Sequence, residues 1–334
     1  MGKQLRIAVV GMGGIGNNHA RCYQAHPHAE VVAVCDVSRE RADTAASAHG
    51  AQAFYSVRRM LNSGVAIDAA SVATAGVENG GDHYTPTMQL LKAGIPVLGE
   101  KPISNEIPKA RRLVRLAREM GLPYGINLNH RFTPAAVKAR DWLDQGRLGE
   151  LHMVNMTMWI NNPNESSPWF HIRALHPHSL DVMRYFAGDL ERVQAFFKKG
   201  QGRRIWSNVQ ANLLFANGVI GHLTGSYDAG GSYGLETLEL VGSEGRVVIN
   251  EACERLTFYP RFSKEVESYD HPGGMMGFAD TFPSRIGAWI DDLRKGTPPD
   301  EVDAKAEDAL KVQLAIESII QSWQKGRVVK VPQR

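Results

Sequence analysis

Apolar and polar positions alternate in a regular order along the first part of the chain, up to about residue 126. Short apolar runs bounded by turn residues predict strands at 5–10, 31–35, 54–55, 69–73, 96–99 and 124–129. Helix-compatible segments lie between them, at 17–25, 38–49, 56–63, 82–93 and 105–120. Strands that alternate with helices predict an α/β domain with a doubly wound parallel sheet.

After about residue 130 the pattern changes to consecutive strands with short turns. Thr133 and Pro134 open a linking helix, and strand patterns follow at 153–159, 192–197, 209–215, 219–226, 237–241, 246–249 and 256–259. Asn217-Gly218 separates two of these and is typical of a hairpin. Further helices are predicted at 179–186, 282–295 and 303–325, the last with Asp303 as its N-cap. This part is predicted to be α+β, with a mostly antiparallel sheet.

The first predicted strand runs into the sequence Gly11-Met12-Gly13-Gly14-Ile15-Gly16, which opens the first helix. Gly11 allows a tight turn, Gly13 lets a pyrophosphate approach the backbone, and Gly16 lets the helix pack closely on the strand. The helix N-terminus offers N–H groups to phosphate. Asp36 ends the second strand, where a carboxylate can bind the ribose of adenosine. We therefore predict a dinucleotide site; the alternative is a glycine-rich turn with Asp36 as a helix cap.

The charge of Asp36 bears on which dinucleotide binds. A carboxylate at this position repels the 2′-phosphate of NADP, which favours NAD. Arg39 lies close in the sequence and would attract that phosphate, so use of NADP as well stays open.

Composition and charge exclude several other classes of protein. The chain has 334 residues, of which 43% are hydrophobic and 22% charged, as in a globular protein of about two domains. A net charge of +3 without a long Lys/Arg run argues against a nucleic-acid partner. No apolar segment has the length of a membrane span or a signal peptide. Scattered cysteines fit reduced thiols, so we expect a cytoplasmic protein without a membrane partner.

Four motifs together resemble those of the Gfo/Idh/MocA oxidoreductases, and the resemblance covers essentially the whole chain. The motifs are the glycine-rich run with Asn18-His19, Glu100-Lys101-Pro102, Arg131-Phe132-x-Pro134, and His178-Ser179-Leu180-Asp181-x-x-Arg184-Tyr185. The resemblance implies an NAD-binding Rossmann domain, assigned to residues 1–126, and an open-faced sheet domain for substrate binding and oligomerisation, assigned to 127–334. It also implies an NAD(P)-dependent dehydrogenase or reductase of sugars, inositols or their derivatives.

The catalytic lysine of this family corresponds to Lys101. Lys101 follows the fifth strand as Gly11 follows the first, so both belong to the edge of the sheet where ligands bind. Pro102 disfavours a helical conformation at Lys101. A lysine ammonium at this edge would favour a developing alkoxide. The alternative is a solvated surface lysine paired with Glu100.

The site histidine of this family corresponds to His178, a residue type suited to exchanging a hydroxyl proton. Many members carry an Asp four residues earlier, where this chain has Ala174. Either His176 or Arg173 replaces the missing carboxylate in the proton relay, or the chemistry differs; for His176 the alternative is a purely structural histidine. A metal held by His171, His176, His178 and Asp181 is not expected, because the spacing fits no zinc motif and Pro177 interrupts a helical arrangement.

The expected site residues form two groups. Cofactor contacts are expected from Gly11, Met12, Gly13, Gly14, Ile15, Gly16, Asp36, Ala73, Thr74, Asn79, His83, Glu100 and Lys101. Substrate contacts are expected from Lys101, Asn129, Arg131, Trp169 and His178. The loop 74–81 would touch the nicotinamide ribose or act as a flexible lid. The polar loop 161–169 would bind a sugar, or else is a solvated turn, and Arg131 would alternatively form a salt bridge between domains.

These residues lead to one main hypothesis and two alternatives. The main one is hydride transfer between NAD and a hydroxyl or keto carbon of a sugar, sugar derivative or inositol-like cyclic polyol. The alternatives are a redox-neutral enzyme that oxidises its sugar only transiently and a nucleotide-binding regulator without activity. The second sheet leaves an apolar face to bury, so we expect a homodimer or homotetramer packed through it.

Overall fold

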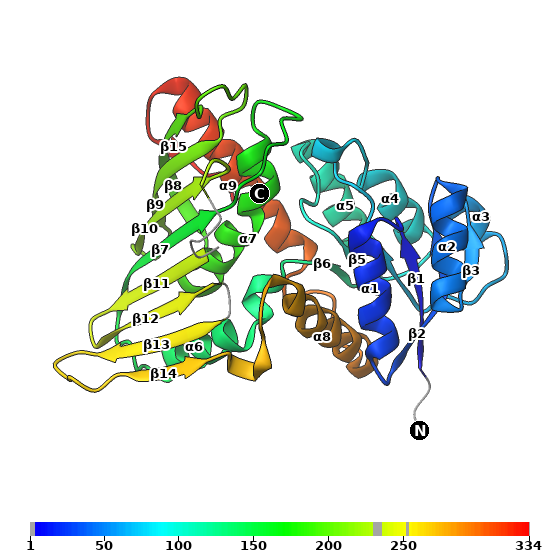
Figure 1. Ribbon diagram of the computed structural model, residues 1–334, viewed down its shortest axis with the longest axis horizontal. Helices are drawn as coiled ribbons and strands as arrows, with labels where there is room; N and C mark the ends of the chain where they lie inside the picture. Colours follow the sequence, from blue (N-terminus) through cyan, green and yellow to red (C-terminus); the bar gives the residue numbers. More distant parts are fainter. Residues whose placement is uncertain (1–3, 230–235, 252–253, 334) are drawn as a thin grey trace. The chain divides into compact units, whose positions relative to one another are not determined.

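The computed structural model describes residues 4–229, 236–251 and 254–333, and the chain divides into two compact units. The first unit consists of Met1–Leu128 and Phe282–Leu310, and the second of Asn129–Thr281 and Lys311–Arg334. Figure 1 shows the elements of each unit. The first boundary lies close to the expected position at 126, but residues 282–310 had been assigned to the second domain.

The first unit is built on a six-stranded parallel sheet in the order β3-β2-β1-β4-β5-β6. Its strands are β1 (Leu5–Val10), β2 (Ala29–Cys35), β3 (Gln52–Phe54), β4 (Ala69–Val72), β5 (Val97–Gly99) and β6 (Tyr124–Ile126). Its helices are α1 (Gly14–Ala25), α2 (Arg39–His49), α3 (Val57–Leu61), η1 (Val77–Asn79), α4 (Tyr84–Lys92), α5 (Ile107–Glu119) and α8 (Thr281–Lys295). The predicted doubly wound sheet is confirmed, and its strand order reverses between β1 and β4, where ligands of such sheets bind.

Local sequence signals account for the starts of the helices in this unit. The hydroxyl of Ser38 accepts a hydrogen bond from the backbone N–H of Arg41 and caps α2. The carboxylate of Asp82 accepts hydrogen bonds from the N–H groups of Tyr84 and Thr85 at the start of α4. Helix α5 buries an apolar stripe formed by Ala110, Leu113, Val114 and Ala117, whereas Met120 after its end is exposed.

Helix α8 belongs to the first unit because its apolar face completes that unit's core. Trp289 and Ile290 are fully buried and lie in one cluster with Ile7, Val9 and Leu98 of the parallel sheet. The sequence pattern showed that residues 282–295 form an amphipathic helix. It held no information on which of two apolar cores that helix covers, so the expected assignment of this segment differs from the structure.

The second unit is built on a nine-stranded sheet in the order β14-β13-β12-β11-β7-β10-β9-β8-β15. Its strands are β7 (Leu151–Trp159), β8 (Leu190–Lys198), β9 (Asn208–Phe215), β10 (Ile220–Ser226), β11 (Glu236–Gly242), β12 (Gly245–Asn250), β13 (Arg255–Pro260), β14 (Glu267–Asp270) and β15 (Val329–Lys330). Strands β7 and β10 pair in parallel and the other described pairs are antiparallel, which confirms the predicted mostly antiparallel sheet.

Three helices lie on the same side of this sheet in Figure 1. They are α6 (Pro134–Asp144), α7 (Phe170–Ala187) and α9 (Ala306–Lys325), most of which belongs to this unit. All three helices contribute apolar side chains to one large buried cluster with the inward-facing residues of the strands, and Phe170 and Leu175 of α7 belong to a smaller one. Thr133 caps α6 by accepting a hydrogen bond from Ala136, as its sequence indicated. Within the described ranges, none of the helices combines the length and apolar character needed to cross a bilayer.

The predicted sixth strand is shorter than expected. Strand β6 stops at Ile126, because the N–H of Leu128 bonds back to the carbonyl of Ile126 and turns the chain. Residues Asn129–Phe132 then form a short 3-10 helix, η2. Asn129 and Arg131 therefore lie on η2 in the second unit and not at the end of a strand.

Two helices of the second unit also differ from their predicted limits. Helix α7 begins at Phe170 and continues through Pro177, although a break was expected there. Proline removes one backbone donor, and burial of Ile172, Leu175 and Leu180 on either side favours the continuous helix. Helix α9 begins at Ala306, and the carboxylate of Asp303 instead accepts a hydrogen bond from the N–H of Ala304.

Candidate active site

The turn after β1 tolerates only glycine at two positions. Gly11 has φ of 91°, and a Cβ atom there would collide with the backbone of Thr74 at the end of β4. A Cβ on Gly16 would collide with the carbonyl of Gly11. In contrast, the space beside Gly13 and Gly14 is open. Side chains are thus excluded where strand and helix meet, and the free N–H groups at the start of α1 remain approachable by a phosphate.

Asp36 is held rigidly at the end of β2. It is 7% exposed, and its Oδ2 accepts a hydrogen bond of 2.8 Å from the N–H of Met12. Its Oδ1 accepts hydrogen bonds from the N–H of Ser38 at 2.8 Å and from Arg41 at 2.9 Å. Burial acts to raise the pKa of Asp36. These hydrogen bonds outweigh burial and lower it below the ordinary value, so the carboxylate is charged near neutral pH.

A pocket of about 720 Å³ lies between the glycine turn after β1 and Asp36. The expected cofactor residues that line it are Gly11, Gly13, Asp36, Ala73, Thr74 and Asn79. An elongated dinucleotide fits such a site, because backbone N–H groups lie near its glycine turn and a charged carboxylate lies at the end of β2. When bound, NAD would supply a nicotinamide ring that accepts or gives a hydride.

Arg41 is a pocket residue that the sequence analysis missed. Its guanidinium forms an ion pair of 2.9 Å with Asp36, and it lines the pocket. The arginine considered from the sequence was Arg39, whose guanidinium instead lies 4.4 Å from the centre of the Tyr55 ring. Both arginines lie in the first turn of α2, and only the direction of each side chain distinguishes them.

Glu100 belongs to a buried polar network behind the lysine. Its Oε1 is 2.9 Å from Nε2 of His19 and accepts a hydrogen bond of 2.5 Å from Asn127. The other nitrogen of His19 lies 2.6 Å from the hydroxyl of Ser71. Burial acts to raise the pKa of Glu100. The hydrogen bonds from His19 and Asn127 and the charge of Lys101 outweigh burial and lower the pKa.

Lys101 follows this network directly, at the carboxyl end of β5. Burial lowers the pKa of its ammonium, and the neighbouring carboxylate of Glu100 acts in the opposite direction. The peptide bond between Lys101 and Pro102 is cis. The position thus combines a desolvated amine with a fixed carboxylate, which is an environment typical of a functional lysine rather than a solvated one.

The loop 74–81 is anchored at both of its ends. His83 is 5% exposed, and its two ring nitrogens lie 2.8 Å from the carbonyl of Thr74 and 2.9 Å from that of Pro102. Glu78 on η1 accepts a hydrogen bond of 3.0 Å from Asn105. The loop is therefore tied to the segment that follows Lys101, which does not favour the flexible lid considered from the sequence. His83 holds this loop rather than lining the pocket.

In the second unit, Arg131 forms a buried, two-pronged ion pair with Asp181. Asp181 lies one turn after His178 on α7, and both residues are at most 5% exposed. The amide of Asn129 donates a hydrogen bond of 2.5 Å to the hydroxyl of Thr281. Arg131 thus has a charged partner within its own unit.

His176 is held in the interior of the second unit. It has no exposed surface, and its nitrogens lie 3.2 Å from Nε2 of His171 and 3.1 Å from the hydroxyl of Ser179. A Cβ on Gly225 would collide with its ring, so the imidazole lies directly against β10. Burial lowers the pKa of His171 to about 3 and that of His176 well below its ordinary value. This geometry favours a neutral, structural pair over the expected proton relay.

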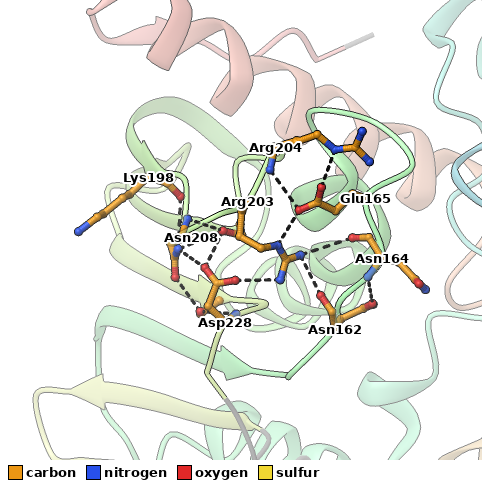
Figure 2. A network of polar contacts seen from close by, with 11 residues as sticks. Asn162, Asn164, Glu165, Lys198, Arg203, Arg204, Asn208 and Asp228 are labelled. Carbon is orange, nitrogen blue, oxygen red and sulfur yellow. Dashed lines mark hydrogen bonds and ion pairs between the residues drawn. The ribbon is translucent and has the colours of Figure 1, made fainter.

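Trp169 and the loop before it are also packed more firmly than expected. The Trp169 ring stacks on Trp206, with 5.9 Å between centroids, and meets the edge of Phe197. Figure 2 shows the preceding loop tied down by Arg203, which pairs with Glu165 at 2.9 Å and donates to two backbone carbonyls of the loop. The same guanidinium pairs with Asp228 at 2.9 Å. The loop is fixed by this network, but Asn161, Pro163 and Asn164 are exposed, so the solvated turn stays an alternative to a sugar-binding loop.

Two models of one protein family match the sequence. The model described as "Oxidoreductase family, NAD-binding Rossmann fold" matches residues 5–128, and the model of the GFO/IDH/MocA C-terminal domain matches residues 136–248. The two matches follow the division of the chain into its two sheets.

Named relatives and a solved structure agree with these models. Inositol 2-dehydrogenase of Rubrobacter xylanophilus is 26% identical, over 90% of this chain and 86% of that protein. D-apiose dehydrogenase of Paraburkholderia graminis is 25% identical, over 98% and 90%. The structure of levoglucosan dehydrogenase in complex with NADH and L-sorbose superposes with a TM-score of 0.89 at 20% identity and covers all of both chains, which shows a common fold.

The first match covers the glycine turn and all strands of the parallel sheet, and the second covers strands β7 to β11 of the other sheet. Because the two models together match more than half of the sequence, this chain belongs to the GFO/IDH/MocA oxidoreductases, with an NAD-binding Rossmann domain at its start.

Proposed function

We propose that this protein is an NAD-dependent dehydrogenase or reductase that acts on a CH–OH group of a sugar or cyclic polyol. The observation that carries the proposal is the pocket beside Gly11, with the charged carboxylate of Asp36 fixed at its edge. The names of the relatives support the substrate class, since they act on inositol and apiose. A screen of sugars and polyols with NAD tests the proposal. Net formation of NADH supports it, and the absence of activity on every compound, although NAD binds, contradicts it.

The chain's own residues would divide the chemistry between them. In the oxidation direction the substrate carbon loses a hydride to the cofactor and its hydroxyl loses a proton, so a ketone is formed. Lys101, as an ammonium, would hold the reacting oxygen and favour its negative charge. His178 would accept the proton as general base. In the reverse direction the same two groups would stabilise the alkoxide and return the proton.

Replacement of Lys101 by Met tests the first of these roles. The side chain keeps its approximate length and loses its charge, so kcat should fall by roughly 100-fold or more, as for other preorganised donors. Affinity for NAD should change little, because the glycine turn that receives the pyrophosphate is intact. Steady-state kinetics and NAD titration of the variant measure both quantities, and an unchanged kcat would remove Lys101 from the mechanism.

Cofactor preference should follow the charge of Asp36. Because this carboxylate stays ionised, NAD should bind at least about tenfold more tightly than NADP, on the order of 1.4 kcal/mol. Asp36→Ser removes the repulsion and releases Arg41 from its ion pair, so this variant should gain affinity for NADP and lose affinity for NAD. Calorimetric titration with both dinucleotides measures the ratio, and equal binding by the unaltered protein would refute the expectation.

Replacement of His176 by Ala distinguishes a role of this histidine in proton relay from a purely structural role. Two buried neutral histidines have pKa values below 6.5, so the unfolded chain binds more protons than the folded one at acidic pH. The contribution of these neutral histidines to the free energy of unfolding should be fully present above about pH 6.5 and should be lost progressively toward pH 3. His176→Ala should lower stability by about 2 kcal/mol or more through its cavity and weaken this acid sensitivity. Denaturant unfolding at several pH values checks this, while a displaced pH–rate profile would instead support the relay.

The assembly state is a further part of the proposal. Helices cover one face of the nine-stranded sheet, and the other face carries exposed apolar side chains such as Met153 and Ile220. Burial of this face in a homodimer or homotetramer would remove it from water. Light scattering at micromolar concentration should show the oligomer. Met153→Lys, which places a charge on this face, should shift the population to monomer, and a monomeric unaltered protein would contradict the proposal.

A further inference from the structure

His83 lies between the loop that lines the dinucleotide pocket and the segment that follows Lys101. Its side chain is buried, and its two ring nitrogens lie 2.8 Å from the carbonyl oxygen of Thr74 and 2.9 Å from that of Pro102. A neutral imidazole donates one N–H and an imidazolium donates two, so at least one of these contacts is a hydrogen bond in either form. The ring therefore connects the turn after β4 with the chain directly after the proposed catalytic lysine.

The loop on one side of His83 is held together by its own hydrogen bonds. The hydroxyl of Thr74 donates a hydrogen bond of 2.8 Å to the carbonyl of Asp82, which joins the two ends of the loop. The N–H of Gly81 donates one of 3.0 Å to the carbonyl of Gly76, and a Cβ at position 81 would collide with the loop's own backbone. Thr74, Gly81 and Asp82 also line the pocket. The wall that a bound dinucleotide would face is thus fixed by contacts within the loop.

The segment on the other side of His83 packs closely against this loop. The amide of Asn105 donates a hydrogen bond of 3.0 Å to Oε1 of Glu78 on η1, and Ile103 is almost fully buried. A cavity of about 10 Å³ lies between loop and segment, lined by residues of both and by His83. Such a volume holds at most about one water molecule. The loop and residues 102–105 therefore have little room to shift against each other.

Lys101 lies in the chain between two fixed points of the backbone. Before it, the N–H of Glu100 donates a hydrogen bond of 2.8 Å to the carbonyl of Val72 in β4. After it, the carbonyl of Pro102 faces the ring of His83. The ammonium stands at the end of a long side chain, so its position depends on how the backbone beneath it is held. A misplacement of about 1 Å at a reacting group can cost about 100-fold in rate.

We propose that His83 is a positioning residue, which fixes the backbone of Lys101 relative to the wall of the dinucleotide pocket. From the sequence, His83 is expected only to contact the cofactor. The inference rests on the proposed role of Lys101, since the effect of His83 on catalysis is exerted through the lysine. It follows that loss of the imidazole should lower turnover while NAD still binds.

The test compares His83→Phe with His49→Phe. His49 is a second histidine of the first unit, and its ring nitrogens lie 2.7 Å from Oε1 of Gln24 and 3.0 Å from Oδ1 of Asn17, both on α1. Both substitutions keep a ring and remove its nitrogens, but of the two rings it is that of His83 that contacts the segment after Lys101. His83→Phe should lower kcat by about tenfold to 100-fold, as for a misplaced reacting group. His49→Phe should keep the kcat of the unaltered protein.

Two further measurements distinguish positioning from a merely structural role. Affinity for NAD should change much less than kcat in His83→Phe, and a loss of affinity as large as the loss of kcat would overturn the inference. Addition of His83→Phe to Lys101→Met should lower kcat little further, because the effects of residues that act as one unit do not add. Multiplied losses in the double variant would also overturn it. His83→Gln, which keeps an N–H donor for the carbonyls, should lower kcat less than His83→Phe, and it takes the place of that variant in both measurements if His83→Phe fails to fold.

A measurement on the protein without substrate keeps the inference separate from the proposed function. Backbone hydrogen exchange, followed by mass spectrometry, should be faster at 74–82 and 103–105 in His83→Phe than in the unaltered protein or His49→Phe, because exchange reports local opening. Unchanged exchange at 103–105 would overturn the inference whatever the enzyme's substrate. If exchange becomes faster as expected but Lys101→Met is fully active, the link between the two segments stands and it is the proposed role of Lys101 that fails.

Discussion

The close approach of two backbone segments governs the nucleotide-binding half of this protein. Where β1 and β4 end, Gly11 and Thr74 come so near that no side chain fits at position 11. The same contact leaves room for a ligand in the pocket lined by both turns. The anchoring of Asp36 to the N–H of Met12 then links the second strand to this turn. The excluded side chain, the pocket and the fixed carboxylate are thus consequences of one packing constraint.

Beyond that turn, the protein holds its polar groups in place by pairing them in the interior. Glu100 is bound by His19 and Asn127, and Asp181 is bound by Arg131. Such buried pairs stabilise a fold only when nearly all of their donors and acceptors are matched. They do fix the orientation of their neighbours, since a charged side chain with two directed partners has little freedom to move. Lys101 directly follows Glu100 in the chain, and His178 lies one turn before Asp181 on α7.

Much of this organisation could be predicted from the sequence, because it depends on short-range patterns. The parallel sheet, the glycine turn and Asp36 follow from apolar runs and fixed spacings. The choice between Arg39 and Arg41 depended on rotamers, which leave no trace in the pattern. The contact of Glu236 with His130 joins residues far apart in the chain, and only the packing of η2 beside the start of β11 brings them together. His176 looked reactive because burial cannot be read from a residue type alone.

The placement of α8 has a consequence for how the molecule is made. The first core includes Trp289, Ile290 and Val302, which come after every strand of the second unit except the short β15. During synthesis, the strands of the Rossmann domain therefore leave the ribosome long before the residues that complete its hydrophobic core. Residues 129–281, by contrast, emerge as one uninterrupted stretch. In the order of synthesis, the nucleotide-binding half is begun first and its core is completed only after that stretch has been made.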